Sequence, residues 1–334
     1  MSKALYSLPF MLLAIVVVAN ILRIGQPVNS GAPNDVCNFL KFKVNLVSNV
    51  NQKKIIFFGF SNVINGINTD VLQHEGKIPV LNFGLVANIT FGHAFQLLEA
   101  VVKPKDILII SLPYFFYTKA TGAENQEDLA SEIALSCPIN GFASLPLSLK
   151  IKALLKIRPK LMIEAIARRS GLSSIFGELG NTGNMFNTTS NGGIYSESGF
   201  KQLPSIRNRE DHQLSKIKIG QQDLTQMIRE KHHGLDALSE LIEALRKRNV
   251  EIYHLFPPIY SETSYEDRAL PLAVLKLMNR FGIPSINSPE DGYFGIDAFY
   301  DSVNHLTEEG AGLYTTSILN SLINRKVFDV SKDY

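Results

Sequence analysis

Apolar runs alternate with polar turns in a strand–helix–strand order over the first third of the chain. A strand is expected over residues 55–58, the first turns of a helix over 62–67, a strand over 78–84, a helix over 87–102 and a strand over 106–111. The longer helix carries apolar residues at helical spacing, at Phe91, Phe95, Leu98 and Val102. Short apolar strands separated by helices are typical of βαβ units in a buried parallel sheet.

The same order returns in the last hundred residues. We expect a helix over 235–247, a strand over 250–256, a helix over 269–281, a short strand over 284–287 and a closing helix over 308–324. Residues 117–234 are less regular, and we interpret them as helices and loops inserted into the domain. The predicted fold class is therefore α/β, a three-layer α/β/α arrangement around a mainly parallel sheet, in a single domain over residues 38–334.

The first residues have the pattern of an export signal. Met1–Leu22 carries Lys3 and then an almost unbroken apolar run, typical of a secretory signal or a membrane anchor. Cleavage after Ala19 stays open, although the length of the run favours an uncleaved anchor. We expect a signal or anchor helix over 1–24, a linker over 25–37, and a domain that faces the periplasm or cell exterior, or is secreted if cleaved.

Charge and cysteine content limit the classes of partner. The 334 residues carry a net charge of +2, and no basic–aromatic pattern suggests nucleic acid. Cys37 and Cys137 lack metal-ligand spacing, so they either pair in an oxidising compartment or are unrelated thiols. No metal site is expected.

Ser61 is the first candidate for chemistry. It follows the first strand on a Gly59-Phe-Ser61 turn, where open α/β sheets bind ligands. The N–H groups of the following helix favour a developing negative charge, which is what an acyl-transferring serine needs. A serine in this position is also a common helix N-cap. The turn therefore indicates catalysis only if another part of the chain supplies a base for Ser61.

That partner is expected near the C-terminus, in Asp301-Ser-Val-Asn-His305-Leu. A histidine can take the serine proton if a carboxylate holds its other ring nitrogen. Asp301 and His305 are four residues apart, so a contact between them is plausible.

Two strand ends supply further candidates. Gly84, in Asn82-Phe-Gly84, suits a backbone N–H that faces the same crevice as Ser61, or a turn glycine chosen for its backbone alone. The aromatic run that contains Tyr114 follows the third strand and could line an acyl or sugar site, with ordinary burial as the alternative.

Together these blocks resemble the SGNH (GDSL-like) hydrolase superfamily, with its SGNH/flavodoxin-like fold, and more narrowly its exported, membrane-anchored branch associated with O-acylation of cell-surface polysaccharides. The resemblance covers about residues 54–111 and 235–324. It implies Ser61 as nucleophile, His305 as base and Asp301 as its orienter, with the N–H groups of Ser61 and Gly84 as the oxyanion hole. It also suggests Asn62, Asn82 and Tyr114 as substrate-binding residues, and no metal or organic cofactor.

The sequence departs from the superfamily pattern at three points. Phe60 stands where Asp is usual, and the Gly-x-Asn-Asp block is missing after Ser111. The Asp301–His305 spacing is one residue longer than the common Asp-x-x-His, and Asp297 is a weaker substitute for Asp301. These departures favour a slow or transfer-specialised enzyme over a general esterase.

Two functions follow as hypotheses. The first is a serine O-acyltransferase or esterase that acts outside the cytoplasm on O-acyl groups, O-acetyl above all, of a cell-surface polysaccharide. Its partners would be a glycan or acylated small molecule, the membrane through the N-terminal helix, and a membrane-bound acyl donor as an open alternative; no nucleic acid is expected. The second is a catalytically weak or inactive glycan-binding or scaffold component of a polysaccharide modification or export assembly.

Overall fold

The computed structural model describes residues 33–75, 77–85, 89, 91–117, 233–261, 265–299 and 305–328. The chain divides into two compact units, Met1–Phe39 with Ala123–Phe186, and Leu40–Gly122 with Asn187–Tyr334. Of the first unit only residues 33–39 are described, so the account below concerns the second.

A four-stranded parallel sheet forms the centre of the second unit, in the order β2-β1-β3-β4. Its strands are β1 (Ile55–Gly59), β2 (Val80–Gly84), β3 (Ile107–Ser111) and β4 (Glu251–His254). Gly59 is in register with Gly84 on one side and with Ser111 on the other. The carboxyl ends of β1, β2 and β3 therefore lie level at one edge of the sheet.

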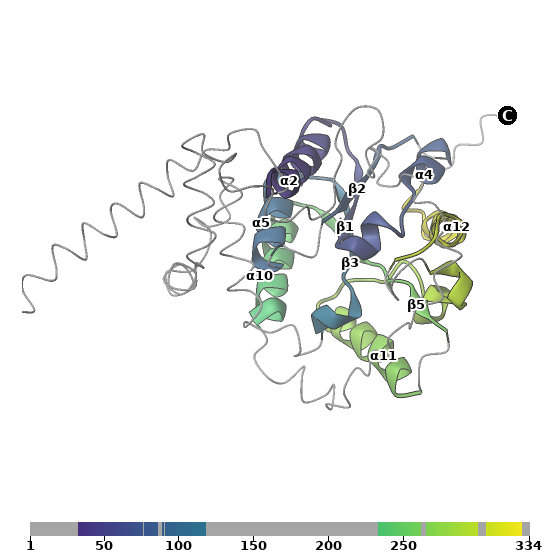
Figure 1. The fold of residues 1–334 in the computed structure, drawn as a ribbon. Helices are drawn as coiled ribbons and strands as arrows, with labels where there is room; N and C mark the ends of the chain where they lie inside the picture. The colour runs from purple at the N-terminus through teal and green to yellow at the C-terminus, as the bar shows by residue number, and fades with distance from the viewer. Residues whose placement is uncertain are drawn as a thin grey trace, which may run out of the picture. The chain divides into compact units, whose positions relative to one another are not determined.

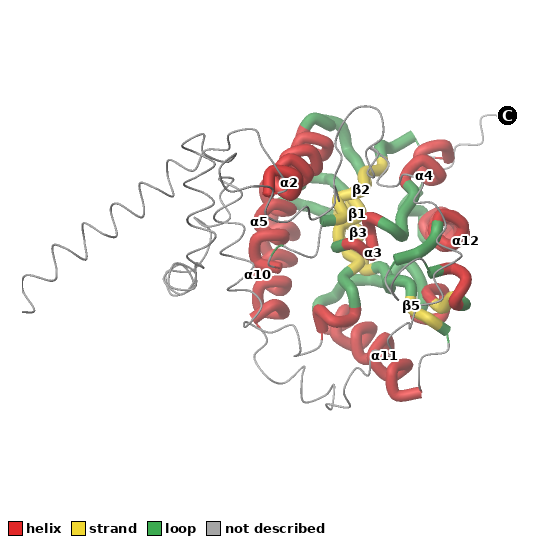
Figure 2. The backbone as a smooth tube through the Cα atoms, in the orientation of Figure 1, coloured by secondary structure: helices red, strands yellow, loops and turns green. Residues whose placement is uncertain are grey.

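Helices connect the strands and cover both faces of the sheet (Figures 1 and 2). The helices are α2 (Pro33–Ser48), α3 (Ser61–Ile64), α4 (Thr69–Glu75), α5 (Phe91–Val101), α10 (His233–Lys247), α11 (Tyr265–Arg280) and α12 (Glu308–Asn324). Helix α5 packs against α10 on one face, and α4 packs against α12 on the other. The described part of the chain is therefore an α/β fold with a parallel sheet flanked by helices.

Short elements complete the carboxyl side of the sheet. A two-stranded parallel ribbon pairs β5 (Ile259–Tyr260) with β6 (Tyr293–Phe294). The described residues also form 3₁₀ turns: η1 (Tyr114–Tyr117) follows β3, and η4 (Pro289–Gly292) and η5 (Ile296–Ala298) lie on either side of β6.

Each face of the sheet has its own apolar layer, because successive side chains of a strand point to opposite faces. Ile55, Phe57 and Ile109 belong to a buried cluster with residues of α12, Tyr314 and Ile318 among them. Phe58 faces the other way and packs its ring against Phe95 of α5, with 5.9 Å between ring centroids. β1, β2 and β3 are buried at every position, which explains why they are mostly apolar in sequence, whereas β4 begins with the exposed Glu251.

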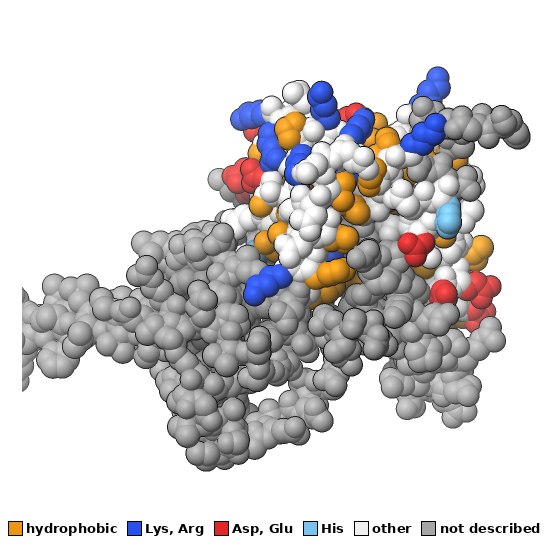
Figure 3. Space-filling view, turned by 90° about the horizontal axis from the view of Figure 1, so that it is seen from above, with side chains coloured by type: hydrophobic (Ala, Val, Ile, Leu, Met, Phe, Trp, Pro, Cys, Tyr) orange, Lys and Arg blue, Asp and Glu red, His pale blue; other side chains and the backbone are white. Residues whose placement is uncertain are grey.

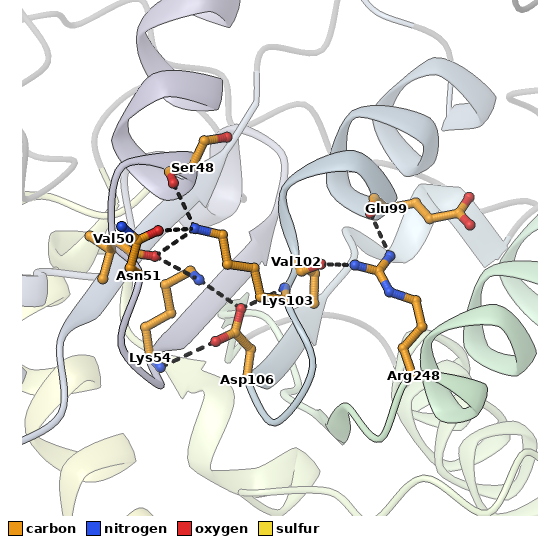
Figure 4. A network of polar contacts seen from close by, with 9 residues as sticks. All are labelled: Ser48, Val50, Asn51, Lys54, Glu99, Val102, Lys103, Asp106 and Arg248. Atoms are coloured by element: carbon orange, nitrogen blue, oxygen red, sulfur yellow. Dashed lines mark hydrogen bonds and ion pairs between the residues drawn. The ribbon is translucent and has the colours of Figure 1, made fainter.

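The amino-terminal edge of the sheet is held by a buried ion pair (Figure 4). Lys54 Nζ lies 2.7 Å from Asp106 Oδ2, and the two side chains are 0% and 1% exposed. The Asp106 carboxylate also accepts a hydrogen bond from the Lys103 N–H at 2.7 Å. Lys103 Nζ in turn donates to the carbonyls of Ser48 and Val50, at the C-terminal end of α2. The pair thus joins the starts of β1 and β3 to the end of α2.

Most expected elements occur within a few residues of their predicted bounds, and three details differ. Helix α2 begins at Pro33, inside the range expected to be a linker, and α4 was not foreseen. The strand expected over 284–287 is a single bridge between Ser285 and His254. The apolar run at residues 1–24, the disulfide question at Cys37 and Cys137 and nearly all of the 117–234 segment lie outside what the structure describes.

No helix in the described ranges is both long enough and apolar enough to span a membrane.

Candidate functional site

Ser61 occupies the first position of α3, directly after the carboxyl end of β1. Its side chain is partly exposed. Among the described residues, neither the hydroxyl nor the N–H of Ser61 has a hydrogen-bond partner. The Asn62 N–H is likewise unengaged within these ranges. The turn therefore contains a hydroxyl and two backbone N–H groups that have no partner among the described residues.

The Ser61 turn is fixed to the end of β3 by Asn62. The Asn62 side chain is 2% exposed. Its Nδ2 donates to the Ser111 carbonyl at 3.0 Å and lies 3.3 Å from Ser111 Oγ, and its Oδ1 accepts from the Phe60 N–H. In this arrangement Asn62 holds the backbone of the turn, and its expected contact with substrate stays a prediction.

Asn82 fixes the same turn from the other side. Its side chain is completely buried, and Nδ2 donates to the carbonyls of Val63 at 2.9 Å and Ile67 at 3.0 Å. Its Oδ1 accepts from the Gly84 N–H at 2.9 Å. The Gly84 N–H, expected to be an oxyanion donor, is thus engaged inside the protein and would be available only if the Asn82 side chain moved.

Two glycines make this close packing possible. A Cβ added at Gly59 would lie 2.2 Å from the Ser111 carbonyl oxygen and 2.4 Å from a methyl carbon of Val63. A Cβ at Gly84 would lie 2.6 Å from the Ile64 nitrogen. All three distances are far shorter than the normal contact distance of a carbon atom, so the approach of α3 to the sheet edge requires glycine at both positions.

The second candidate, His305, lies on the C-terminal segment that packs into the apolar core. His305 is partly exposed and begins the described segment that leads into α12. The next residue, Leu306, forms an antiparallel bridge with Phe299 and belongs to the buried cluster that contains Val63 of α3. Asp301, the expected orienter of His305, lies outside the described residues.

Helix α12 is joined directly to the chain that follows the Ser61 turn. Thr315 Oγ1 accepts from the Asn68 N–H at 3.0 Å and donates to the Gly66 carbonyl. These bonds link residues almost 250 positions apart, so they fix the C-terminal block relative to the serine block.

Tyr114 lies three residues beyond the end of β3, in η1. Its side chain is 5% exposed, and its hydroxyl has no hydrogen-bond partner among the described residues. Burial raises the pKa of Tyr114 well above its usual value, and the charges of Tyr314 and Tyr293 raise it further. The hydroxyl is thus a neutral donor at all physiological pH values, and its expected role in binding substrate stays a prediction.

A second hydroxyl–imidazole pair lies next to the sheet but is fully enclosed. His254 Nδ1 is 3.2 Å from Ser285 Oγ, and the two residues are 0% and 8% exposed. Burial lowers the pKa of His254 to about 3, so the ring is neutral near pH 7. Because Ser285 is buried and Ser61 is partly exposed, Ser61 is the better candidate nucleophile.

Lys43 is the main residue next to the candidate site that the sequence pattern did not reveal. It is completely buried, and its Nζ donates to the Asn82 carbonyl at 2.7 Å and lies 3.5 Å from Asn82 Oδ1. Burial lowers the pKa of Lys43 to about 7. The available signal was its spacing: Lys43 falls between Phe39 and Val47 on the apolar face of a helix, where a solvated lysine is not expected.

The described residues contain no group of three or more His, Cys, Asp and Glu side chains placed to hold a metal ion. No model of a known protein family matches the chain, and a search of curated proteins finds no match either.

Proposed function

We propose that this protein is an exported serine O-acyltransferase or esterase of SGNH-like, three-layer α/β/α type, which acts on O-acyl groups of a cell-surface polysaccharide. The observation that carries the proposal is the state of Ser61. Its hydroxyl is partly exposed at the carboxyl edge of a parallel sheet and, within the described ranges, has no competing hydrogen bond. His305 stands on a segment packed into the same apolar cluster as α3.

The reaction would proceed in two displacements. Ser61 Oγ attacks the acyl carbonyl carbon while His305 takes the hydroxyl proton, and the carbonyl oxygen becomes an oxyanion. The intermediate collapses, the C–O bond to the leaving alcohol breaks, and His305 returns the proton to that alcohol. A sugar hydroxyl or water then attacks the acyl-enzyme with His305 as base, so the acceptor decides between transfer and hydrolysis.

The oxyanion would accept hydrogen bonds from the N–H groups of Ser61 and Asn62. The Gly84 N–H would become a third donor only if the Asn82 side chain moved. Loss of one oxyanion donor lowers turnover about 100- to 1000-fold in other enzymes. We therefore expect a slow enzyme. The engaged Gly84 N–H also favours the second function, a glycan-binding or scaffold component without catalysis.

Turnover of p-nitrophenyl acetate by the purified full-length protein tests the proposal. We expect a burst of nitrophenolate followed by slow turnover, both abolished in Ser61→Ala and strongly reduced in His305→Ala. Ser317→Ala, at a partly buried serine of α12, and His74→Ala, on the exposed side of α4, are matched controls that should retain activity. Equal activity in Ser61→Ala and Ser317→Ala would leave only the binding function.

A further inference from the structure

The amino-terminal edge of the sheet carries a concentration of positive charge that the acyl chemistry does not use. Three turns contribute to it: the turn before β3 supplies Lys103 and Lys105, the turn before β4, counted from the last two residues of α10, supplies Arg246, Lys247 and Arg248, and the turn after α12 supplies Arg325 and Lys326. We call these seven residues the basic edge. The only acidic residue within the three turns is Asp106, which is buried against Lys54. Figure 3, which looks down from above the view of Figure 1, shows several Lys and Arg side chains on that face, with Asp and Glu side chains beside some of them.

Neutral groups, and not carboxylates, hold several of these cations in place. Arg246 donates to the carbonyls of Phe281 and Gly282, and Arg248 donates to the carbonyls of Glu99 and Val102 (Figure 4). A carbonyl orients a guanidinium without cancelling its charge. The ion pairs seen among the described residues, Lys53 with Glu251 and Lys54 with Asp106, involve none of the seven.

Two lysines of the basic edge stand at positions that glycine would occupy at less cost. Lys105 has a φ of 71° and Lys326 a φ of 59°, both in the left-handed region. Both side chains are exposed. The backbone therefore gains nothing from lysine at either turn, whereas each exposed side chain adds a positive charge to this edge.

The opposite edge of the sheet has the opposite sign. The described stretches 285–299 and 305–310 contain Glu290, Asp291, Asp297, Glu308 and Glu309, and neither contains Lys or Arg. Helix macrodipoles favour acidic residues at helix starts and basic residues at helix ends, which accounts for part of this separation. The same effect extends to Lys326, one residue beyond the C-cap of α12, but not to Lys105, which lies four residues beyond the end of α5.

We propose that the basic edge is the surface by which this domain lies on a bilayer of anionic phospholipid. This inference rests on the charge distribution and on the apolar run expected to anchor residues 1–24, and it is independent of the acyl chemistry. A tether of that kind keeps the domain at the membrane, where a basic surface meets a high local concentration of anionic headgroups. Ser61, at the other edge of the sheet, would then face away from the lipid.

The strength of docking should follow the number of charges. Each Lys or Arg near an anionic bilayer contributes about 1 kcal/mol, or about fivefold in the docking equilibrium. The attraction falls off within about a Debye length, so salt should weaken it.

The test uses the full-length protein reconstituted into neutral phosphatidylcholine vesicles and into vesicles that contain phosphatidylglycerol, and it measures amide hydrogen exchange. The anchor is common to both preparations, so a difference in amide exchange between them reports on the surface of the domain. We expect slower exchange over residues 102–106, 245–250 and 324–328 in the anionic vesicles alone, with loss of this protection at high salt.

A double variant, Lys105→Gly/Lys326→Gly, removes two charges while it relieves both left-handed backbones, so weaker docking cannot be attributed to misfolding. We expect the docking equilibrium to fall about 25-fold in this variant. The control is Lys276→Ala, at an exposed position of α11 outside the basic edge. Protection that does not depend on lipid charge overturns the proposal. So does protection produced by soluble dextran sulfate and not by anionic vesicles, which would assign the basic edge to a polyanionic polymer.

Discussion

Lys43 shows how one buried residue can couple the candidate site to pH. Its pKa falls from 10.5 to about 7 on folding, because burial penalises the charged amine. Between these values the unfolded chain binds more protons than the folded protein, so stability rises with pH across this window. Below pH 7 both states are protonated, and the cost of the buried charge is present in full.

We therefore expect the free energy of unfolding to increase by up to about 1.4 kcal/mol for each pH unit above 7, from this residue alone. The variant Lys43→Met has no amine to titrate, so its stability should change less between pH 7 and pH 9. Urea unfolding of both proteins at pH 7, 8 and 9 gives the two slopes. Parallel slopes would show that Lys43 does not titrate in this range.

Asn82 is the second residue on which the Ser61 turn depends. Its replacement by leucine leaves the Ile67 carbonyl and the Gly84 N–H without their partners, whereas the Val63 carbonyl still accepts from the Ile67 N–H. Each unsatisfied buried group costs about 1–3 kcal/mol, so Asn82→Leu should destabilise the protein by about 2 kcal/mol or more. Asn45→Leu, at an exposed position of α2, is the control and should change the urea midpoint little. Equal effects of the two variants would contradict the bonding described for Asn82.

At the scale of elements, two adjacent lysines just before β1 allow a buried and an exposed ion pair to be compared. Lys54 and Asp106 are buried, whereas Lys53 and Glu251 are 44% and 50% exposed. Breaking a buried pair leaves an uncompensated charge and costs about 3–5 kcal/mol, but an exposed pair contributes about 1 kcal/mol at most.

Asp106→Asn should therefore lower the free energy of unfolding several times more than Glu251→Gln. Both changes remove one negative charge and keep the side-chain shape. Similar losses in the two variants would mean that water reaches the Lys54 amine.

The contact between α3 and the sheet edge gives a second comparison of elements. Because a Cβ at Gly59 would overlap the Ser111 carbonyl, Gly59→Ala should destabilise the protein by about 1–3 kcal/mol. Gly92 in α5 has nothing within 4 Å of the corresponding Cβ, so Gly92→Ala should stabilise it by up to about 1 kcal/mol. Thermal unfolding of the two variants should show shifts of opposite sign. A neutral Gly59→Ala would require that α3 can move away from β3.

For the whole molecule, the strands were easiest to predict from the sequence where every residue of a strand is buried. Strands β1 and β3 are buried at every position, so they appear in the sequence as apolar runs. The start of α2 was missed because it follows a stretch rich in Pro, Gly and Asn, although proline is favoured in the first turn of a helix. The brief α4 offers too few residues for a periodic pattern.

The position of Ser61 was predictable from the strand–turn–helix order, but its surroundings were not. The bonds of Asn82 depend on the packing of β2 against α3, and those of Thr315 depend on how α12 returns to the chain after Ser61. Both are tertiary contacts between segments that no local pattern relates. Burial of Lys43 likewise follows from the position of α2 against β2, since a lysine in isolation is expected in water.

The central claim, that Ser61 is a nucleophile activated by His305, is tested most directly by covalent labelling. The full-length protein is treated with a fluorophosphonate, which phosphonylates activated serines, and the modified residue is identified by peptide mass spectrometry. The account predicts a single adduct on Ser61, present in Ser317→Ala and His74→Ala, and labelled far more slowly in His305→Ala. An unmodified Ser61, or an adduct that forms equally fast without His305, would contradict it.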